Sequence, residues 1–489
     1  MNKLFLKGRN FYFIGIFLYF VCFRFFLILC SDDYFWVGNK GQYLLHHFFI
    51  GNATFGGSGN GRYLGSILEI YSVRHLIIAM LAYGFFLTLL IYLIYKIAGS
   101  NFSSLILGIL GILLIPKGLF TDVIAWNAAF VNYVPPMVTA LFFIWTNMEK
   151  HRDTFSFSVF MGIVMLCGQL FLESMTVYQL LLVACTVVCQ KVFTRERIAK
   201  YNYFALTGTL IGTFLMIINP SYYMISNSSY RQTTHGIIQI INNYIFQTHF
   251  YFLTFNGLLN ALIAALFILI LLCKSRVRLR KIIITILSGY LAYFVFINTY
   301  VNYKSVTPLF VINNLSVHIA YLDTFVMTSF WFLIILLTLY LLPIKLKVMV
   351  ILFQISGGIT AGPYLIVASP LRIREYFGNY IFMLLVALLI ADYAIQLVLK
   401  GIKFDFSKFK FFSALLVSLL ALNLIFVMSI NHHVNTIRTN DVTWLNSNKA
   451  LTKHVPFRNH VKNLDMLNAQ FKFYYKDRHD MTFVQRLLH

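Results

Sequence analysis

The chain has 489 residues, of which 59% are hydrophobic, 17% aromatic and only 11% charged. This composition excludes a soluble globular protein of the same length, because such a protein needs more polar residues to cover its surface. The formal net charge of +23 would favour nucleic acid as the partner of a soluble protein. Most of the basic residues lie in short segments between apolar runs, so membrane topology explains them and no nucleic acid is expected as a partner.

Apolar runs of 17 to 22 residues recur between Asn10 and Ile430, and each is long enough to cross a hydrocarbon core of about 30 Å. They predict an all-α polytopic membrane protein with about thirteen transmembrane helices. The first run is interpreted as a retained span and not as a signal peptide, because bulky residues follow it where a cleavage site requires small ones. The predicted spans are residues 10–30, 76–96, 103–120, 125–146, 155–172, 175–193, 203–219, 257–273, 282–301, 325–343, 347–364, 379–399 and 411–430.

An odd number of spans puts the N-terminus inside and the C-terminus outside. The segments predicted to be inside carry 21 Lys and Arg residues, whereas the longer outside loops carry 8 before the C-terminal tail, as expected for cytoplasmic loops. We therefore expect one transmembrane domain, residues 1–430, and an extracytoplasmic tail or small cap, residues 431–489. The long outer loops, 31–75 and 221–255, are expected to contain re-entrant or interfacial helices. Ionisable residues within spans are few, chiefly Arg24 and Asp392.

An acidic pair, Asp32 and Asp33, follows the first span directly, although the whole chain has only 16 Asp and Glu residues. Two adjacent carboxylates at a membrane boundary repel each other and are partly desolvated, which suits one of them to general base catalysis. The structural alternative is that Asp32 caps a short helix and that Asp33 is solvated.

Other polar residues are predicted to lie at the same outer face. Arg62 stands in the sequence Asn-Gly-Arg-Tyr-Leu-Gly, where two glycines let the backbone approach a ligand closely. Because arginine matches the geometry of phosphate, these residues indicate a site for a phosphate-bearing sugar donor. The structural alternative for each is an arginine that reaches lipid headgroups or a solvated turn residue. The predicted binding residues are Arg62, Asn132, Tyr133, Glu173, Arg231, Arg372 and Arg374.

Five short motifs together resemble the GT-C class of polytopic glycosyltransferases, in particular its bacterial GtrII-like branch. They are SDDYFW, NGRYLG, NAAFVNYVPP, ESMT and SPLRIREYFG, in this order along the chain. The resemblance implies a GT-C-like helical bundle in a bacterial plasma membrane and a polyprenyl-phosphate-linked sugar as donor. It also implies that Asp32 or Asp33 deprotonates the acceptor, a cell-surface glycan or glycolipid, with inversion at the anomeric carbon.

Two other classes of function stay open. A flippase or transporter of lipid-linked oligosaccharides also needs about a dozen spans, but it should place ionisable residues inside several of them. A surface polysaccharide polymerase or ligase uses lipid-linked substrates but does not require the acidic pair. No metal site and no certain cofactor are expected, although a divalent cation such as Mg²⁺ or Mn²⁺ at the acidic pair stays open.

Overall fold

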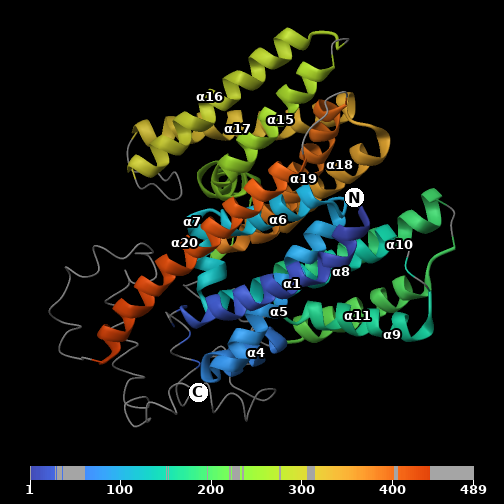
Figure 1. Cartoon of the computed structure of the whole chain (residues 1–489), viewed down its shortest axis with the longest axis vertical. Helices are drawn as coiled ribbons and strands as arrows, with labels where there is room; N and C mark the ends of the chain where they lie inside the picture. Colours follow the sequence, from blue (N-terminus) through green and yellow to red (C-terminus); the bar gives the residue numbers. More distant parts are fainter. Residues whose placement is uncertain are drawn as a thin grey trace. The chain divides into compact units, whose positions relative to one another are not determined.

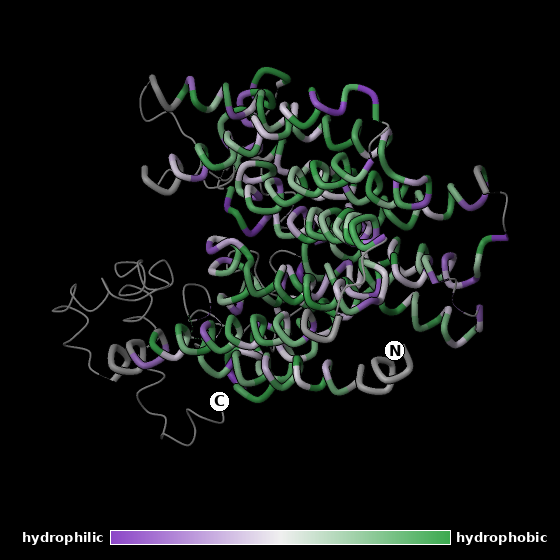
Figure 2. The backbone as a smooth tube through the Cα atoms, turned by 45° about the horizontal axis from the view of Figure 1, so that its top comes forward, coloured by the Kyte–Doolittle hydropathy of each residue, from purple (hydrophilic) through white to green (hydrophobic). Residues whose placement is uncertain are grey.

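The computed structural model of the chain describes residues 2–27, 29, 33, 36, 61–149, 151, 153–194, 197–219, 222, 232–233, 236–274, 277–304, 314–369, 371–400 and 406–440. These residues are helical apart from one short pair of strands and the connecting turns. Nine helices in this part of the chain are long and apolar enough to cross a membrane. Hydrophobic residues line most of their length (Figure 2). These helices indicate a multi-pass membrane protein.

The nine helices overlap nine of the thirteen predicted spans, although the helix Ile237–Cys273 begins well before the predicted span 257–273. A tenth crossing results if Phe102–Leu113 and Lys117–Ala125 form one broken span. The three other predicted spans correspond to helices that do not meet the same criteria, of which Phe11–Phe25 and Phe155–Gln169 are shorter apolar helices. The predicted total of thirteen therefore stays a prediction.

The first of two compact units consists of Met1–Leu93, Lys117–Met224 and Ala414–His489, as far as these segments are described (Figure 1). Two helices are shared with the second unit, because α20 (Phe406–Asn440) begins in it and α5 (Leu76–Ile97) ends in it. The unit contains α1 (Asn2–Phe25), α4 (Tyr63–Arg74), α5 (Leu76–Ile97), α7 (Lys117–Leu119), the short π-helix η3 (Phe120–Ala125), α8 (Asn127–Glu149), α9 (Phe155–Gln169), α10 (Glu173–Cys189), the π-helix η4 (Gln190–Thr194), α11 (Lys200–Ile217) and most of α20 (Phe406–Asn440).

Helix α8 forms the core of this unit, because its apolar side chains are buried along most of its length. It continues through Pro135 and Pro136, although proline lacks the backbone N–H of a regular helix. The carbonyl oxygen of Pro136 accepts hydrogen bonds from Gln179 Nε2 at 2.8 Å and from Thr139 Oγ1 at 2.9 Å. Thr139 of α8 itself and Gln179 of α10 thus place hydrogen-bond donors on the backbone beside the prolines.

Helices α9 and α11 pack closely because glycines lie at their contact. Gly208 and Gly212 are four residues apart on α11 and therefore lie on one face. A Cβ atom at Gly208 would lie 2.1 Å from the carbonyl oxygen of Gly162, and one at Gly212 would lie 2.6 Å from Gln169 Cβ. Small residues at this spacing let the backbones of membrane helices approach each other.

The second unit consists of Ile94–Pro116 and Ile225–Ser413, again as far as they are described. Its strands are antiparallel, and they pair Gln232 with Ser369 and Thr233 with Val367. The unit contains α6 (Phe102–Leu113), β1 (Gln232–Thr233), α13 (Ile237–Asn243), the π-helix η6 (Tyr244–Thr248), α14 (His249–Phe252), the 3₁₀-helix η7 (Thr254–Asn256), α15 (Gly257–Cys273), α16 (Arg280–Lys304), α17 (Asn314–Leu341), α18 (Ile344–Ala361), η8 (Gly362–Leu365), β2 (Val367–Ser369), η9 (Ile373–Tyr376) and α19 (Phe377–Leu399).

Helix α19 lies at the core of the second unit and packs against α6, α15 and α18. Tyr380 OH donates to Gly111 O at 2.6 Å. The Asp392 carboxylate, predicted to lie within a span, accepts a hydrogen bond from Asn101 Nδ2 at 2.6 Å and another from Gln396 Nε2 at 2.8 Å. Polar side chains of this helix are therefore paired inside the unit.

Two predicted boundaries differ from the structure for identifiable reasons. The predicted span 103–120 is interrupted after Leu113, directly before Pro116, which lacks the N–H needed to continue a helix. Helix α17 begins at Asn314, well before the predicted span 325–343. As a result, Asp323 lies inside a helix that is long and apolar enough to cross a membrane, in addition to the predicted intramembrane residues Arg24 and Asp392.

The glycine contact between α9 and α11 yields a test. We expect Gly208→Ala to lower the stability of the protein by about 1–3 kcal/mol, because the added methyl group overpacks a backbone contact. The thermal unfolding midpoint of the purified protein in lipid nanodiscs measures this effect. Gly289→Ala on α16 is the matched control, because a Cβ there meets no described atom within 4 Å. Equal midpoints for the two variants would contradict the packing.

Candidate functional site

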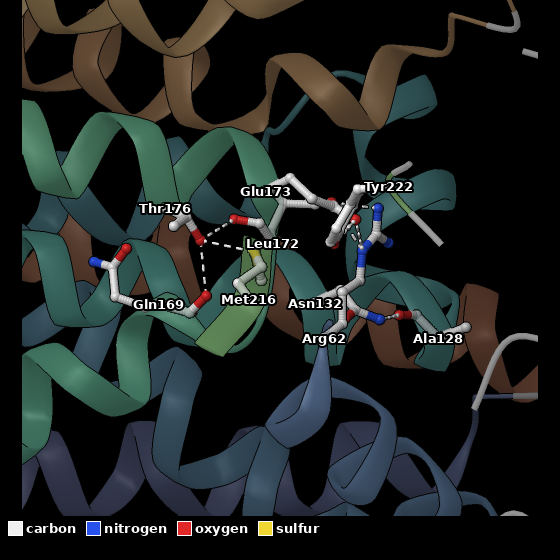
Figure 3. A network of polar contacts seen from close by, with 9 residues as sticks. All are labelled: Arg62, Ala128, Asn132, Gln169, Leu172, Glu173, Thr176, Met216 and Tyr222. Carbon is white, nitrogen blue, oxygen red and sulfur yellow. Dashed lines mark hydrogen bonds and ion pairs between the residues drawn. The ribbon is translucent and has the colours of Figure 1, made fainter. Parts of the chain in front are cut away.

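An ion pair between Arg62 and Glu173 forms the centre of the candidate site in the first unit (Figure 3). Arg62 Nε lies 2.9 Å from Glu173 Oε2 and Arg62 Nη2 lies 2.7 Å from the same oxygen. Tyr222 OH donates to Glu173 Oε1 at 2.9 Å. The side chains of Arg62 and Glu173 are 21% and 29% exposed, so the pair is partly accessible to solvent.

Two glycines position Arg62 before the start of α4. Gly61 has a φ of +64°, a conformation that glycine adopts without strain, and a Cβ there would lie 2.7 Å from Met216 O. A Cβ at Gly65 would lie 2.1 Å from Asn132 Oδ1. In this structure the glycines make room for Met216 and Asn132, and the predicted approach of their backbone to a ligand stays a prediction.

A tight turn between α9 and α10 positions Glu173. Thr176 Oγ1 lies 2.7 Å from Gln169 O and 3.0 Å from Leu172 O, and this hydroxyl closes the turn (Figure 3). The turn lies between the predicted spans 155–172 and 175–193. Glu173 is the first residue of α10, where the helix dipole favours a negative charge.

Helix α8 contributes Asn132 and Tyr133 to the same place. Asn132 Nδ2 donates to Ala128 O at 2.7 Å, so the amide is held along its own helix beside Gly65. Both residues are buried. Burial opposes the charge of Arg62, but the carboxylate of Glu173, helped by the phenols of Tyr133 and Tyr222, outweighs it and raises the pKa of the guanidinium. Arg62 therefore stays charged.

Asp33 attaches the segment after the first span to the start of α8. Its side chain is buried, and Oδ1 accepts a hydrogen bond from the backbone N–H of Ala128 at 2.9 Å. Next to it, Arg74 Nε donates to Trp36 O at 3.2 Å. The structural alternative, in which Asp33 is solvated, is therefore wrong. Asp33 acts as a capping group for α8 although it lies in a distant part of the sequence. Asp32 lies outside the described residues.

The remaining predicted arginines belong to the second unit. Arg372 is exposed and Arg374 is half-buried, on either side of the start of η9. The backbone N–H of Arg372 donates to Glu375 Oε2 at 2.9 Å. Arg231 lies outside the described residues, but the two residues that follow it form β1 and pair with β2, which precedes Arg372. The structure thus brings Asp33, Arg62, Asn132, Tyr133 and Glu173 together in one unit and keeps Arg372 and Arg374 in the other.

Sequence reasoning did not single out two features. Tyr222 was only one of two tyrosines after a span, and its contact with Glu173 joins residues 49 positions apart. Asp323 and His249 form a buried pair, 3.0 Å between Oδ2 and Nε2, across 74 positions. The sequence signal for this pair is that Asp323 stands close to an apolar run, and a longer predicted span would have included it.

In the described part of the chain, no group of three or more His, Cys, Asp or Glu side chains is arranged to hold a metal ion. A divalent cation at the acidic pair stays a prediction because Asp32 lies outside that part. Comparison with models of protein families, with curated proteins and with solved structures gives no match.

The contact of Asp33 with α8 predicts different effects for two substitutions. Asp33→Ala removes the acceptor of the Ala128 N–H and should destabilise the protein by about 0.5–2 kcal/mol. Asp33→Asn keeps an acceptor oxygen and should retain most of the stability, since asparagine caps helices well. Thermal unfolding in nanodiscs compares the two variants. If Asp33→Ala unfolds at the wild-type temperature, Asp33 does not support α8.

Proposed function

We propose that the protein is a membrane glycosyltransferase of the plasma membrane of a bacterium. It transfers a sugar from a polyprenyl-phosphate-linked donor to a glycan or glycolipid acceptor at the outer cell surface. One observation supports this proposal above others. Arg62 and Glu173, chosen from separate motifs, form a partly exposed ion pair, and Tyr133 from a third motif interacts with Arg62.

The contacts favour a division of work between the predicted binding residues. Arg62 directs Nε and Nη2 at Glu173, so we assign this pair and Tyr222 to the hydroxyl groups of the sugar. A pyranose ring presents several hydroxyls that need donors and acceptors in fixed positions, which a bidentate ion pair supplies. Arg372 and Arg374 belong to the second unit, and their predicted role in binding the donor stays a prediction.

The proposed reaction is a displacement at the anomeric carbon of the donor. The acceptor hydroxyl oxygen forms the new bond to that carbon, and one carboxylate of the Asp32–Asp33 pair takes the hydroxyl proton. The bond between the anomeric carbon and the phosphate oxygen breaks, and its electron pair leaves with the polyprenyl phosphate. Arginine side chains stabilise the charge of this leaving group. The configuration at the anomeric carbon is inverted.

A flippase or transporter of lipid-linked sugars is the second candidate. The buried pair of Asp323 and His249 lies in membrane-spanning helices of the second unit, and ionisable residues at such depth are a requirement of that class. The first unit offers the better argument for transfer, because its accessible ion pair is close to the residues of the predicted site.

Glu173→Gln tests the proposed function. The variant keeps the shape of the side chain but loses the charge that orients Arg62 and Tyr222. We expect sugar incorporation into surface glycans to fall by about 10- to 100-fold, as the loss of hydrogen bonds to a charged group worth about 1.5–3 kcal/mol implies. The assay uses a host strain that lacks the chain and is complemented with each variant at equal membrane abundance.

Glu149→Gln is the matched control, because Glu149 is the last residue of α8 and its side chain is 41% exposed. We expect this variant to transfer sugar at the wild-type rate. Full transfer by Glu173→Gln at normal abundance would contradict the assignment of this site to the sugar.

A further inference from the structure

A second polar cluster lies inside the second unit and centres on the carboxylate of Asp323. Asp323 Oδ2 lies 3.0 Å from His249 Nε2 and 2.5 Å from Thr254 Oγ1, while Oδ1 lies 2.8 Å from Tyr293 OH. Asp323 and His249 are both 0% exposed. The four side chains come from α17, α14, η7 and α16, so the cluster joins four separate elements.

Hydrogen-bond geometry fixes the number of protons in this pair. His249 Nδ1 lies 3.0 Å from the carbonyl oxygen of Tyr244, which only accepts, so Nδ1 carries a hydrogen. The short distance between Nε2 and Asp323 Oδ2 then requires one more proton between these two atoms. Tyr293 and Thr254 donate to the same carboxylate, which favours its ionised form and places the shared proton on His249.

One proton makes the pair electrically neutral as a whole. Without it, Asp323 would be an anion that no cationic partner among the described residues compensates, and a buried, uncompensated charge costs several kcal/mol. The titratable groups that face the pair are the phenols of Tyr244 and Tyr293. Neither carries a charge at neutral pH that would replace the proton.

The pair is not placed for catalysis on a substrate. Both ring nitrogens of His249 and both carboxylate oxygens of Asp323 have partners within the protein, and neither side chain is exposed. A general acid or base must reach the group with which it exchanges a proton.

His249 instead lies on an irregular helical segment, Ile237–Asn256, which we call the broken helix, whereas Asp323 lies on α17. Here the π-helix η6 and the 3₁₀-helix η7 flank the single turn α14 that carries His249. Such interruptions in membrane helices accompany functional sites, and ionisable residues beside them bind ions or relay protons. Asn243 Nδ2 ties the start of the broken helix to Leu365 O at 2.9 Å, whereas α14 is joined to α17 through His249 and Asp323.

We propose that His249 and Asp323 form a proton-binding site whose single proton holds α14 against α17, and that release of the proton loosens the broken helix. This site is independent of the sugar transfer proposed for the first unit. The ligand is a proton, and the element that responds is the segment Tyr244–Phe252.

Nitrogen-15 NMR of the full chain in lipid nanodiscs tests the bound proton. The protein carries ¹⁵N-labelled histidine, and the His249 signals are identified by their loss in His249→Gln. At neutral pH we expect hydrogens on both nitrogens of His249, because Nδ1 faces the Tyr244 carbonyl and Nε2 faces the Asp323 carboxylate. In the Asp323→Asn variant, His249 should carry a hydrogen on only one of its two nitrogens. A wild-type His249 with one N–H at neutral pH, unchanged by Asp323→Asn, would overturn the proposal.

Amide hydrogen exchange of residues 244–252 tests the response. In the wild type, exchange corrected for its intrinsic pH dependence should rise by roughly tenfold or more once His249 loses its second N–H, a loosening of about 1.4 kcal/mol. Asp323→Asn should show fast exchange at every pH. Asp392→Asn is the matched control, because this carboxylate of the same unit bonds only to Asn101 and Gln396 among the described contacts. Wild-type exchange that stays the same when His249 loses its second N–H, or an equal effect in Asp392→Asn, would refute the response.

Discussion

The ion pair of Arg62 and Glu173 is the interaction on which the candidate site depends. In a chain with so few charged residues, an arginine and a glutamate at the ends of apolar helices need partners. Each is the other's partner at 2.7 Å, and the pair fixes the segment before α4 against the start of α10. Gly61 and Gly65, on either side of Arg62, allow the close packing that positions Arg62, and the hydrogen bond of the Thr176 hydroxyl to Gln169 O closes the turn that positions Glu173.

Much of the helical arrangement follows from the apolar runs. The span predicted at 76–96 is α5 (Leu76–Ile97), and the one at 379–399 is α19 (Phe377–Leu399), because a run of about twenty apolar residues specifies a membrane helix almost alone. Hydropathy was less informative about where a helix is interrupted and where it begins. It did not register the interruption before Pro116, nor the polar turns that extend α17 back to Asn314.

The site was predictable in its members but not in its pairings. Short motifs predicted Arg62 and Glu173 as binding residues, which stays a prediction, and nothing local in the sequence indicates their contact across 111 positions. Asp33 followed from its position after the first span, whereas its hydrogen bond to Ala128 N depends on the fold. The contact between His249 and Asp323 was not predicted for the same reason, since each residue alone looks like an isolated polar side chain beside an apolar run.

The central claim is that Arg62 and Glu173 stabilise the first unit as a pair. A double-mutant cycle of unfolding free energy, with Arg62→Met, Glu173→Met and the double variant in nanodiscs, measures it most directly. For a bidentate pair that is partly exposed, the predicted coupling is about 1–2 kcal/mol. The double variant should then be no less stable than either single variant, because neither charge is left without its partner. Effects of the two substitutions that simply add would contradict the account.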